Sequence, residues 1–235
     1  DAEQKGVSLA KTPIMYYHIA EFFRVATGSR LLVQAAAEEK YTGAFTEIAQ
    51  MQQHAAGAIR QVGVWVGGKD TPHINNLNKV CEDLAAINMP LSAVIAYRLT
   101  KKELTALPDL GTNANPRVSV CIAQDGAGLG AHLQKKLGAD KTAITALGAC
   151  MGAIARAKVH ESIAWVEKQN LVSTTYVGET GGDIPADLAK ELDVPALVDG
   201  SLMLSLSNTE IEALNNKRYL FLRKHVGQSG SYWND

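Results

Sequence analysis

The chain has 235 residues, which is enough for one large domain or two small ones. Hydrophobic residues make up 46% of it and support a substantial core, while charged residues make up 20% and leave a net charge of −1. This balance argues against a nucleic-acid-binding protein, which needs a basic stripe to hold phosphates, so we expect no nucleic-acid partner.

Hydrophobic periodicity predicts alternating helices and strands in the first half of the chain. Helices are expected at 16–25, at 44–56 with Gly57 in a helix-stop position, from 70–72 to a break at 88–90, and at 101–107. Strands are expected at 30–36, 59–66, 91–97 and 118–123. The last of these is a nearly continuous apolar run, which is typical of a strand covered on both faces.

The second half is predicted to be mainly helical. Helices are expected at 128–137, 141–158, 183–191 and 208–216, with Asp140 and Asn208 as N-caps, and strands at 174–177 and 218–226. In the final strand we expect Leu220 and Leu222 to be buried, with Tyr219 and Phe221 on the opposite face. The residues after Gly227 are expected to be exposed and poorly ordered.

The order of these elements predicts the fold class. Strands and helices alternate, and the segments between strands are long enough for crossover helices. We therefore expect an α/β layered domain with a mostly parallel central sheet flanked by helices, formed by residues 1–235 as a single body.

One glycine-rich segment is a candidate nucleotide site. Gly126, Gly128 and Gly130 follow the strand at 118–123 and precede a predicted helix, where backbone N–H groups approach phosphates in nucleotide-binding proteins. Their spacing is G-x-G-x-G rather than the dinucleotide-binding G-x-G-x-x-G. A tight turn without a ligand is the competing interpretation.

Metal and catalytic motifs are absent from the sequence. The six histidines are scattered and are expected to be surface or capping groups, and no pair of the three cysteines has metal-ligand spacing. Cys81, Cys121 and Cys150 have apolar neighbours, which indicates small buried hydrophobic residues. We expect no metal, no cofactor and no catalytic residue.

Gly148 and Gly152 lie four residues apart in a run of small residues, on one face of the predicted helix. Each glycine inside a helix costs roughly 1 kcal/mol relative to alanine. Close packing of another helix or strand against this face, within the domain or between subunits, is the expected compensation.

Two further features of the sequence concern a possible membrane span and the two ends of the chain. The longest weakly polar run, 142–155, is too short to span a bilayer, which needs about 20 apolar residues. The chain opens on Asp1 and closes shortly after the aromatic pair Tyr232 and Trp233. We expect it to be the body of a larger protein with both ends missing.

Four segments together carry a family resemblance: residues 16–23 (YYHIAEFF), 59–65 (IRQVGVW), 146–165 (ALGACMGAIARAKVHESIAW) and 217–235. They resemble the sheath proteins of contractile phage tails and of related contractile injection systems, most closely the tail-sheath-like proteins of prophages. In that family a helix after the central sheet carries a small-residue step. A later short helix and a Leu-Asn turn lead through a strand into a Gly-rich loop.

The resemblance implies a structural subunit rather than an enzyme. Copies would assemble as hexameric rings or a helical sheath around an inner tail tube protein, attached to a baseplate. The particle would be assembled in the bacterial cytoplasm and would carry the protein in its tail, without membrane insertion. An N-terminal arm and a C-terminal tube-facing domain would lie outside this chain, and terminal arms would add strands to the sheets of neighbouring copies. The alternative is an α/β enzyme or nucleotide-binding protein that uses residues 125–130.

Overall fold

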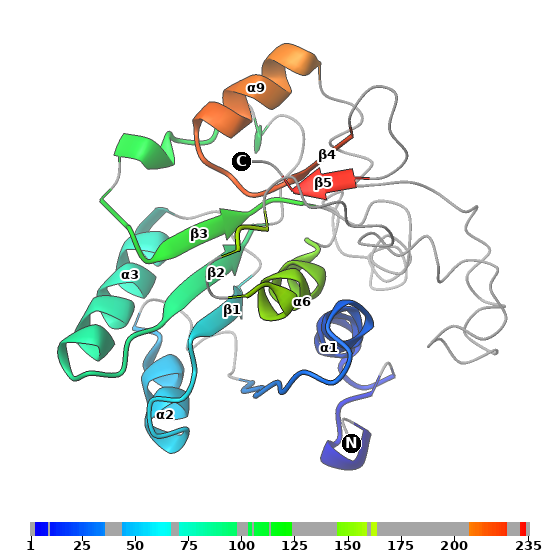
Figure 1. Ribbon diagram of the computed structural model, residues 1–235, viewed down its shortest axis with the longest axis vertical. Helices are drawn as coiled ribbons and strands as arrows, with labels where there is room; N and C mark the ends of the chain where they lie inside the picture. Colours follow the sequence, from blue (N-terminus) through cyan, green and yellow to red (C-terminus); the bar gives the residue numbers. More distant parts are fainter. Residues whose placement is uncertain are drawn as a thin grey trace, which may run out of the picture.

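The protein is built around a three-stranded parallel sheet (Figure 1). Strands β1 (Gln61–Trp65), β2 (Ser92–Ala96) and β3 (Val118–Cys121) lie in the order β1-β2-β3, with Val62 opposite Ala93 and Ile95 opposite Val120. The computed structural model describes residues 3–8, 10–35, 44–66, 71–97, 103–104, 106–112, 114–123, 145–158, 161–163, 207–224 and 231–233. The predicted α/β fold, with a mostly parallel sheet flanked by helices, is confirmed.

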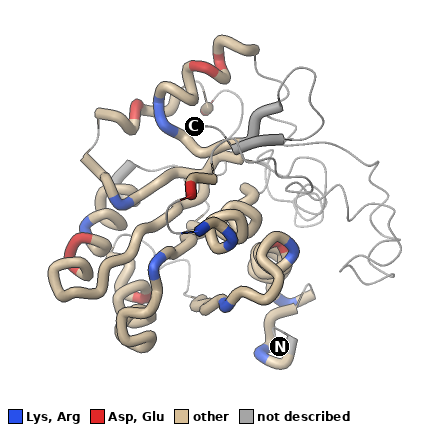
Figure 2. Tube along the Cα trace, in the orientation of Figure 1, with Lys and Arg blue, Asp and Glu red and all other residues tan. Residues whose placement is uncertain are grey.

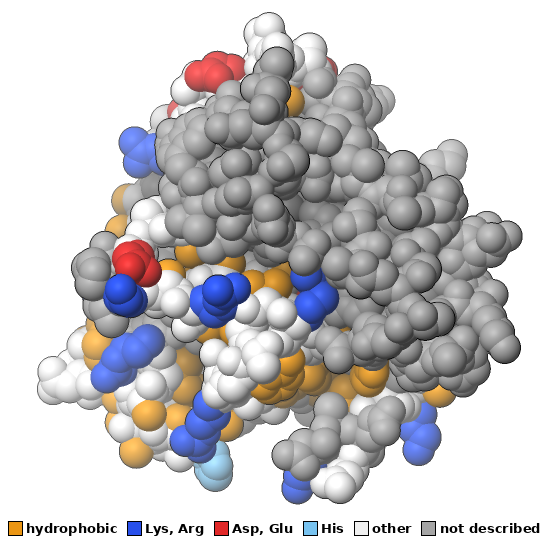
Figure 3. Space-filling model, turned by 45° about the vertical axis from the view of Figure 1, so that its right-hand side comes forward, with side chains coloured by type: hydrophobic (Ala, Val, Ile, Leu, Met, Phe, Trp, Pro, Cys, Tyr) orange, Lys and Arg blue, Asp and Glu red, His pale blue; other side chains and the backbone are white. Residues whose placement is uncertain are grey.

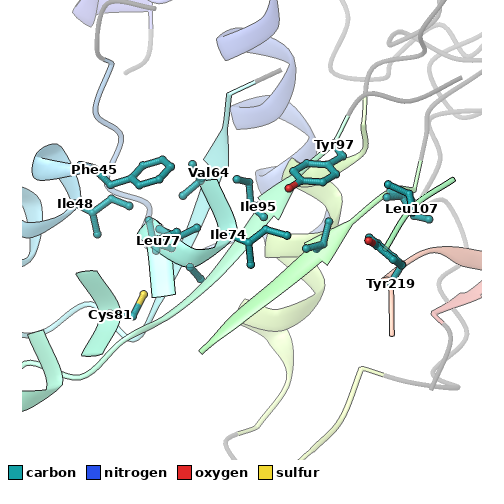
Figure 4. Packing of buried hydrophobic residues seen from close by; sticks show 14 of the residues in the cluster. Phe45, Ile48, Val64, Ile74, Leu77, Cys81, Ile95, Tyr97, Leu107 and Tyr219 are labelled. Atoms are coloured by element: carbon teal, nitrogen blue, oxygen red, sulfur yellow. The ribbon is translucent and has the colours of Figure 1, made fainter. Parts of the chain in front are cut away.

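One face of the sheet is covered by α2 (Thr46–His54) and α3 (Thr71–Ala86). Helix α3 presents an apolar stripe at three- and four-residue spacing, formed by Ile74, Leu77, Cys81 and Leu84. These side chains pack with Phe45 and Ile48 and with alternate strand residues such as Val64 and Ile95 (Figure 4). The break predicted at 88–90 is confirmed, because α3 ends at Ala86 and Asn88 has a left-handed backbone with φ of 62°.

The opposite face is covered by α6 (Leu147–Arg156), and α1 (Pro13–Val25) packs against α6 on the same side (Figure 1). The strand residues that face α6 are small: Val94, Ala96, Cys121 and Ala123. Small side chains on both surfaces let the helix lie close to the sheet. The three cysteines are buried free thiols, as predicted.

A buried glutamine fixes the connection between α2 and the sheet. The side chain of Gln52 is fully buried, and its Nε2 donates to the carbonyl oxygens of Ile59 at 2.9 Å and Met89 at 3.0 Å. Its Oε1 accepts from the Ile59 N–H at 3.1 Å. Gly57, with φ of 75°, reverses the chain between α2 and β1, which confirms its helix-stop role.

The C-terminal part returns to the sheet after α9 (Asn208–Asn216). The N–H of Leu220 donates to Val120 and the N–H of Ile122 donates to Leu220, each at 2.8 Å, so this segment continues the sheet beyond β3. Strands β4 (Leu222–Lys224) and β5 (Ser231–Trp233) then form an antiparallel pair. Short 3-10 helices η1 (Glu3–Lys5) and η3 (Leu110–Thr112) complete the described elements.

Three predictions about this C-terminal part are wrong. The N-cap of α9 is Ser207, whose side chain forms a capping box with Glu210, and not Asn208. Tyr219 and Phe221 are fully buried while Leu220 is only partly covered, because pairing with β3 turns the aromatic residues into the core on the α3 side. Residues 231–233 form β5, where a poorly ordered segment was expected, while the expected exposure after Gly227 stays a prediction.

Charged side chains avoid the sheet. Figure 2 shows them on helices and connecting segments, and β1, β2 and β3 contain none. Within the described residues, no helix has both the length and the apolar character needed to cross a membrane.

Candidate functional site: a groove at the open edge of the sheet

Within the part of the chain that the structure describes, one edge of the parallel sheet is open. Among the described residues, β1 pairs with β2 alone. The carbonyl oxygen of Arg60 accepts from the N–H of Ser92 at 3.0 Å, and the residues of a parallel strand alternate between its two neighbours. The backbone N–H and C=O groups of Gln61 and Gly63 are therefore directed away from β2, toward the open edge.

A groove runs along this edge, which we call the edge groove. Its volume is about 930 Å³, and it is lined by β1, α1, α2, α6 and the extended residues 30–35. The lining is mainly apolar and includes Met15, Met51 and Met151, three of the five methionines in the chain. Unbranched methionine side chains adapt to different partner shapes. The groove therefore has the size and character of a binding site.

Among the described residues, the charged ones that line the edge groove are Arg30, Glu47 and Arg60. The Arg60 guanidinium donates to the carbonyl oxygen of Gly57 at 2.6 Å, which holds it beside the start of β1. Figure 3 shows one face of the molecule, on which hydrophobic atoms reach the surface among Lys and Arg side chains. An apolar groove beside unpaired strand groups suits an extended polypeptide.

Gly63 shapes the floor of the groove. A Cβ at this position would lie 2.8 Å from Cγ of Met151, so a side chain here would displace the methionine of α6. The glycine therefore lets α6 pack onto β1 while the strand edge stays accessible.

The wall formed by α1 and α6 is packed through its backbone. Gly148 and Gly152 of α6 lie directly against the α1 carbonyl oxygens of His18 and Phe22. The predicted close packing at these glycines is confirmed, and the partner is a helix of the same chain. Because the contact involves backbone on both sides, α1 and α6 behave as one rigid unit.

The least expected residue of the site is His18, which also lines the groove. Its ring contacts Trp65 of β1, with the centroids 4.6 Å apart, and both ring nitrogens are buried without a hydrogen-bond partner. Burial lowers the pKa of His18 to about 3, so its imidazole is neutral at pH 7. The prediction that each histidine is a surface or capping group is wrong here. The aromatic neighbours Tyr16 and Tyr17 were the available sequence signal.

The structure does not test the sequence-predicted nucleotide site. Gly126, Gly128 and Gly130 lie outside the described residues, so the ligand hypothesis for this loop stays a hypothesis. The described part of the chain contains no group of three or more His, Cys, Asp or Glu side chains placed to hold a metal ion.

The chain belongs to the DUF2586 family, because the model of the DUF2586 N-terminal domain matches residues 25–235. That span contains the whole parallel sheet, α2, α3, α6 and α9. Comparisons with curated proteins and with solved structures find no match.

Proposed function

We propose that the protein is a structural subunit of a contractile tail sheath. Copies assemble around an inner tube protein, attach to a baseplate, and contract to drive the tube through a cell envelope. The resemblance of four segments to sheath proteins supports this function. Three of these segments contribute α1, β1 and α6, which together line the edge groove.

The open edge of β1 is the observation that carries the proposal. An exposed strand edge is a ready site for pairing with a strand from another molecule. The outward backbone groups of Gln61 and Gly63 would bond to the added strand, and the apolar lining would take its side chains. Repeated between copies, this contact would link subunits into rings or a helix.

The rigid pairing of α1 with α6 suits the mechanical part of the function. Contraction of a sheath would be a rearrangement of whole subunits, and the subunits must transmit force without deforming. Backbone-to-backbone contact at Gly148 and Gly152 leaves little room for sliding between the two helices.

Negative-stain microscopy of the full-length protein, expressed alone, tests the proposal, with long hollow cylinders as the expected result. Gln61→Pro removes an outward N–H at the first residue of β1, where proline is tolerated, so it should leave the melting temperature nearly unchanged and reduce cylinder formation. Lys79→Ala, on the exposed side of α3, is the matched control and should assemble normally.

The outcomes separate two questions. Full-length protein that stays monomeric at every concentration would contradict the sheath function. Cylinders formed equally well by Gln61→Pro would contradict only the use of the β1 edge as the contact.

A further inference from the structure

A short extended segment beside the edge groove has no defined role in the fold. We call residues 31–35 the strap; they follow α1 and line the groove together with β1. The strap was predicted to be a strand, but its backbone joins no ladder with any of the residues that the structure describes. Leu32 is 37% exposed and Val33 is 49% exposed, and they are two of the four exposed large hydrophobic residues in the described part of the chain.

The strap has the sequence of a strand that is covered on both faces. Leu31, Val33 and Ala35 would lie on one face of a strand, and Leu32 and Gln34 on the other. Apolar residues on both faces are typical of strands inside an α/β sandwich. The strap also matches β1 in length, because each has five residues and spans roughly 17 Å when extended.

A glycine turn on the N-terminal side of the strap provides a hinge. Ala26 and Phe45 are buried and anchor the chain on either side. Between Ala26 and the strap, Gly28 has φ of 83° and nothing within 4 Å of its Cβ position. The hydrogen bonds of this turn are local, from the Ser29 N–H to the Ala26 carbonyl oxygen and from the Thr27 hydroxyl to the Phe23 carbonyl oxygen, each at 3.1 Å. Hinges of this kind absorb backbone rotation at a few residues.

We propose that the strap closes onto the open edge of β1 as a fourth strand of the sheet, and that the closed form excludes strands from other molecules. Closure pairs the outward groups of Gln61 and Gly63, fills the edge groove and removes Leu32 and Val33 from water. Covering an exposed edge is how many proteins prevent unwanted pairing. The strap is thus an intramolecular competitor for the groove, whichever molecule the groove serves.

Disulfide trapping tests strand-like closure. Gln61→Cys is combined in turn with Leu32→Cys, Val33→Cys and Gln34→Cys, and the protein is oxidised with diamide at low concentration. The side chains of a strand alternate between its two faces, so the pattern of cross-links should alternate as well. Gln61→Cys should cross-link either with Val33→Cys and not with Leu32→Cys or Gln34→Cys, or with one or both of the latter and not with Val33→Cys. The native cysteines are buried and do not compete, and Gln61→Cys alone is the control. Monomers are separated on non-reducing gels and the bridges located by peptide mass spectrometry.

Hydrogen exchange gives an independent measurement that needs no cysteine. The amides of Gln61 and Gly63 should exchange faster in Val33→Pro than in the wild type, because proline in the strap disrupts the added strand. Amides within α3 serve as the internal reference and should be unchanged. Faster exchange in α3 as well would show general destabilisation, and the cross-links then decide.

Three results would overturn the inference. They are cross-links of similar yield at all three strap positions, cross-links found only between two molecules, and unchanged exchange at Gln61 and Gly63 together with no cross-link. None of these measurements requires assembly into a sheath, so failure of the proposed function would leave the strap inference standing.

Discussion

The carbonyl oxygen of His18 occupies the space in which a β-carbon on Gly148 would lie. One helical turn further along, a Cβ on Gly152 would be 2.8 Å from the carbonyl oxygen of Phe22 and 2.8 Å from Cβ of Val25. These distances are shorter than real Cβ contacts, so α1 and α6 approach each other as closely as backbones allow. The helix that covers the sheet and the helix that borders the edge groove are therefore joined at two glycines.

Substitution by alanine should destabilise the protein more at Gly148 than at Gly152. Gly148→Ala should lower the free energy of unfolding by about 2–3 kcal/mol, because overpacking against backbone exceeds the gain of about 1 kcal/mol in helix propensity. Gly152→Ala should cost less, since part of its contact is the side chain of Val25. Urea unfolding measures both. Ala155→Gly, at an exposed position of α6, is the control and should cost about 1 kcal/mol. A Gly148→Ala protein as stable as the wild type would contradict the packing argument.

The buried amide of Gln52 should be indispensable. Gln52→Met keeps the volume but leaves the carbonyl oxygens of Ile59 and Met89 and the N–H of Ile59 without this partner. Each buried group that loses its hydrogen bond costs about 1–3 kcal/mol, so we expect an unfolding free energy lower by about 3 kcal/mol or more. Gln53→Met, at the exposed neighbouring position, should change stability by no more than about 0.5 kcal/mol. Equal effects of the two substitutions would show that the bonds contribute nothing.

His18 should make the protein sensitive to acid. The unfolded chain binds a proton at His18 near pH 6.5, whereas the folded protein, with the pKa of this group lowered to about 3, does not. The stability linked to His18 is therefore complete above pH 6.5 and is lost as the pH falls toward 3. Between pH 7.5 and 5 the loss from this residue is about 2 kcal/mol.

Comparison with two variants checks this pH dependence. His18→Phe keeps an aromatic ring against Trp65 and removes the titrating group, so its unfolding free energy should fall less between pH 7.5 and 5 than that of the wild type. His54→Gln removes an exposed histidine at the end of α2 and should retain the wild-type dependence. Identical pH profiles for His18→Phe and the wild type would rule out His18 as the cause.

Prediction from the sequence succeeded where the interactions join residues close together in the chain, and it failed where they join distant segments. Local periodicity was sufficient to predict the apolar stripe of α3 and the buried strands, because each of these patterns is formed by residues that are close together in the sequence. The spacing of Gly148 and Gly152 predicted close packing but not its partner, since nothing near α6 in sequence identifies α1. The same limit applies to His18, which is buried by Trp65 from a distant strand.

The strap illustrates the opposite error. Leu31, Leu32 and Val33 favour extended backbone, so residues 30–36 were predicted to be a strand. A strand also needs a neighbour with which to form a ladder, and propensity carries no information about that neighbour. The open edge of β1 was missed for the same reason, because strand order is a property of the assembled sheet.

The labelling rates of Cys81 and Cys150 should measure separately how readily the two faces of the sheet open. A hydrogen bond with the Cys121 side chain, together with burial, raises the pKa of Cys150 well above its usual range, and burial raises the pKa of Cys81 to about 11. Alkylation requires the thiolate, so iodoacetamide at pH 8 should label both cysteines slowly in the native wild-type protein.

Gly148→Ala should change this pattern more on one face than on the other. The substitution loosens α6 from α1, so labelling of Cys150 should become faster, because local opening of α6 exposes it. Cys81 lies in the other core cluster, between α3 and the sheet, and should be accelerated less, because it gains only from the greater population of globally unfolded protein. Peptide mass spectrometry after timed labelling measures the two rates in one sample. An equal increase in the labelling rates of Cys81 and Cys150 would mean that the whole domain opens at once. It would contradict the inference that α1 and α6 open from the sheet as a unit of their own.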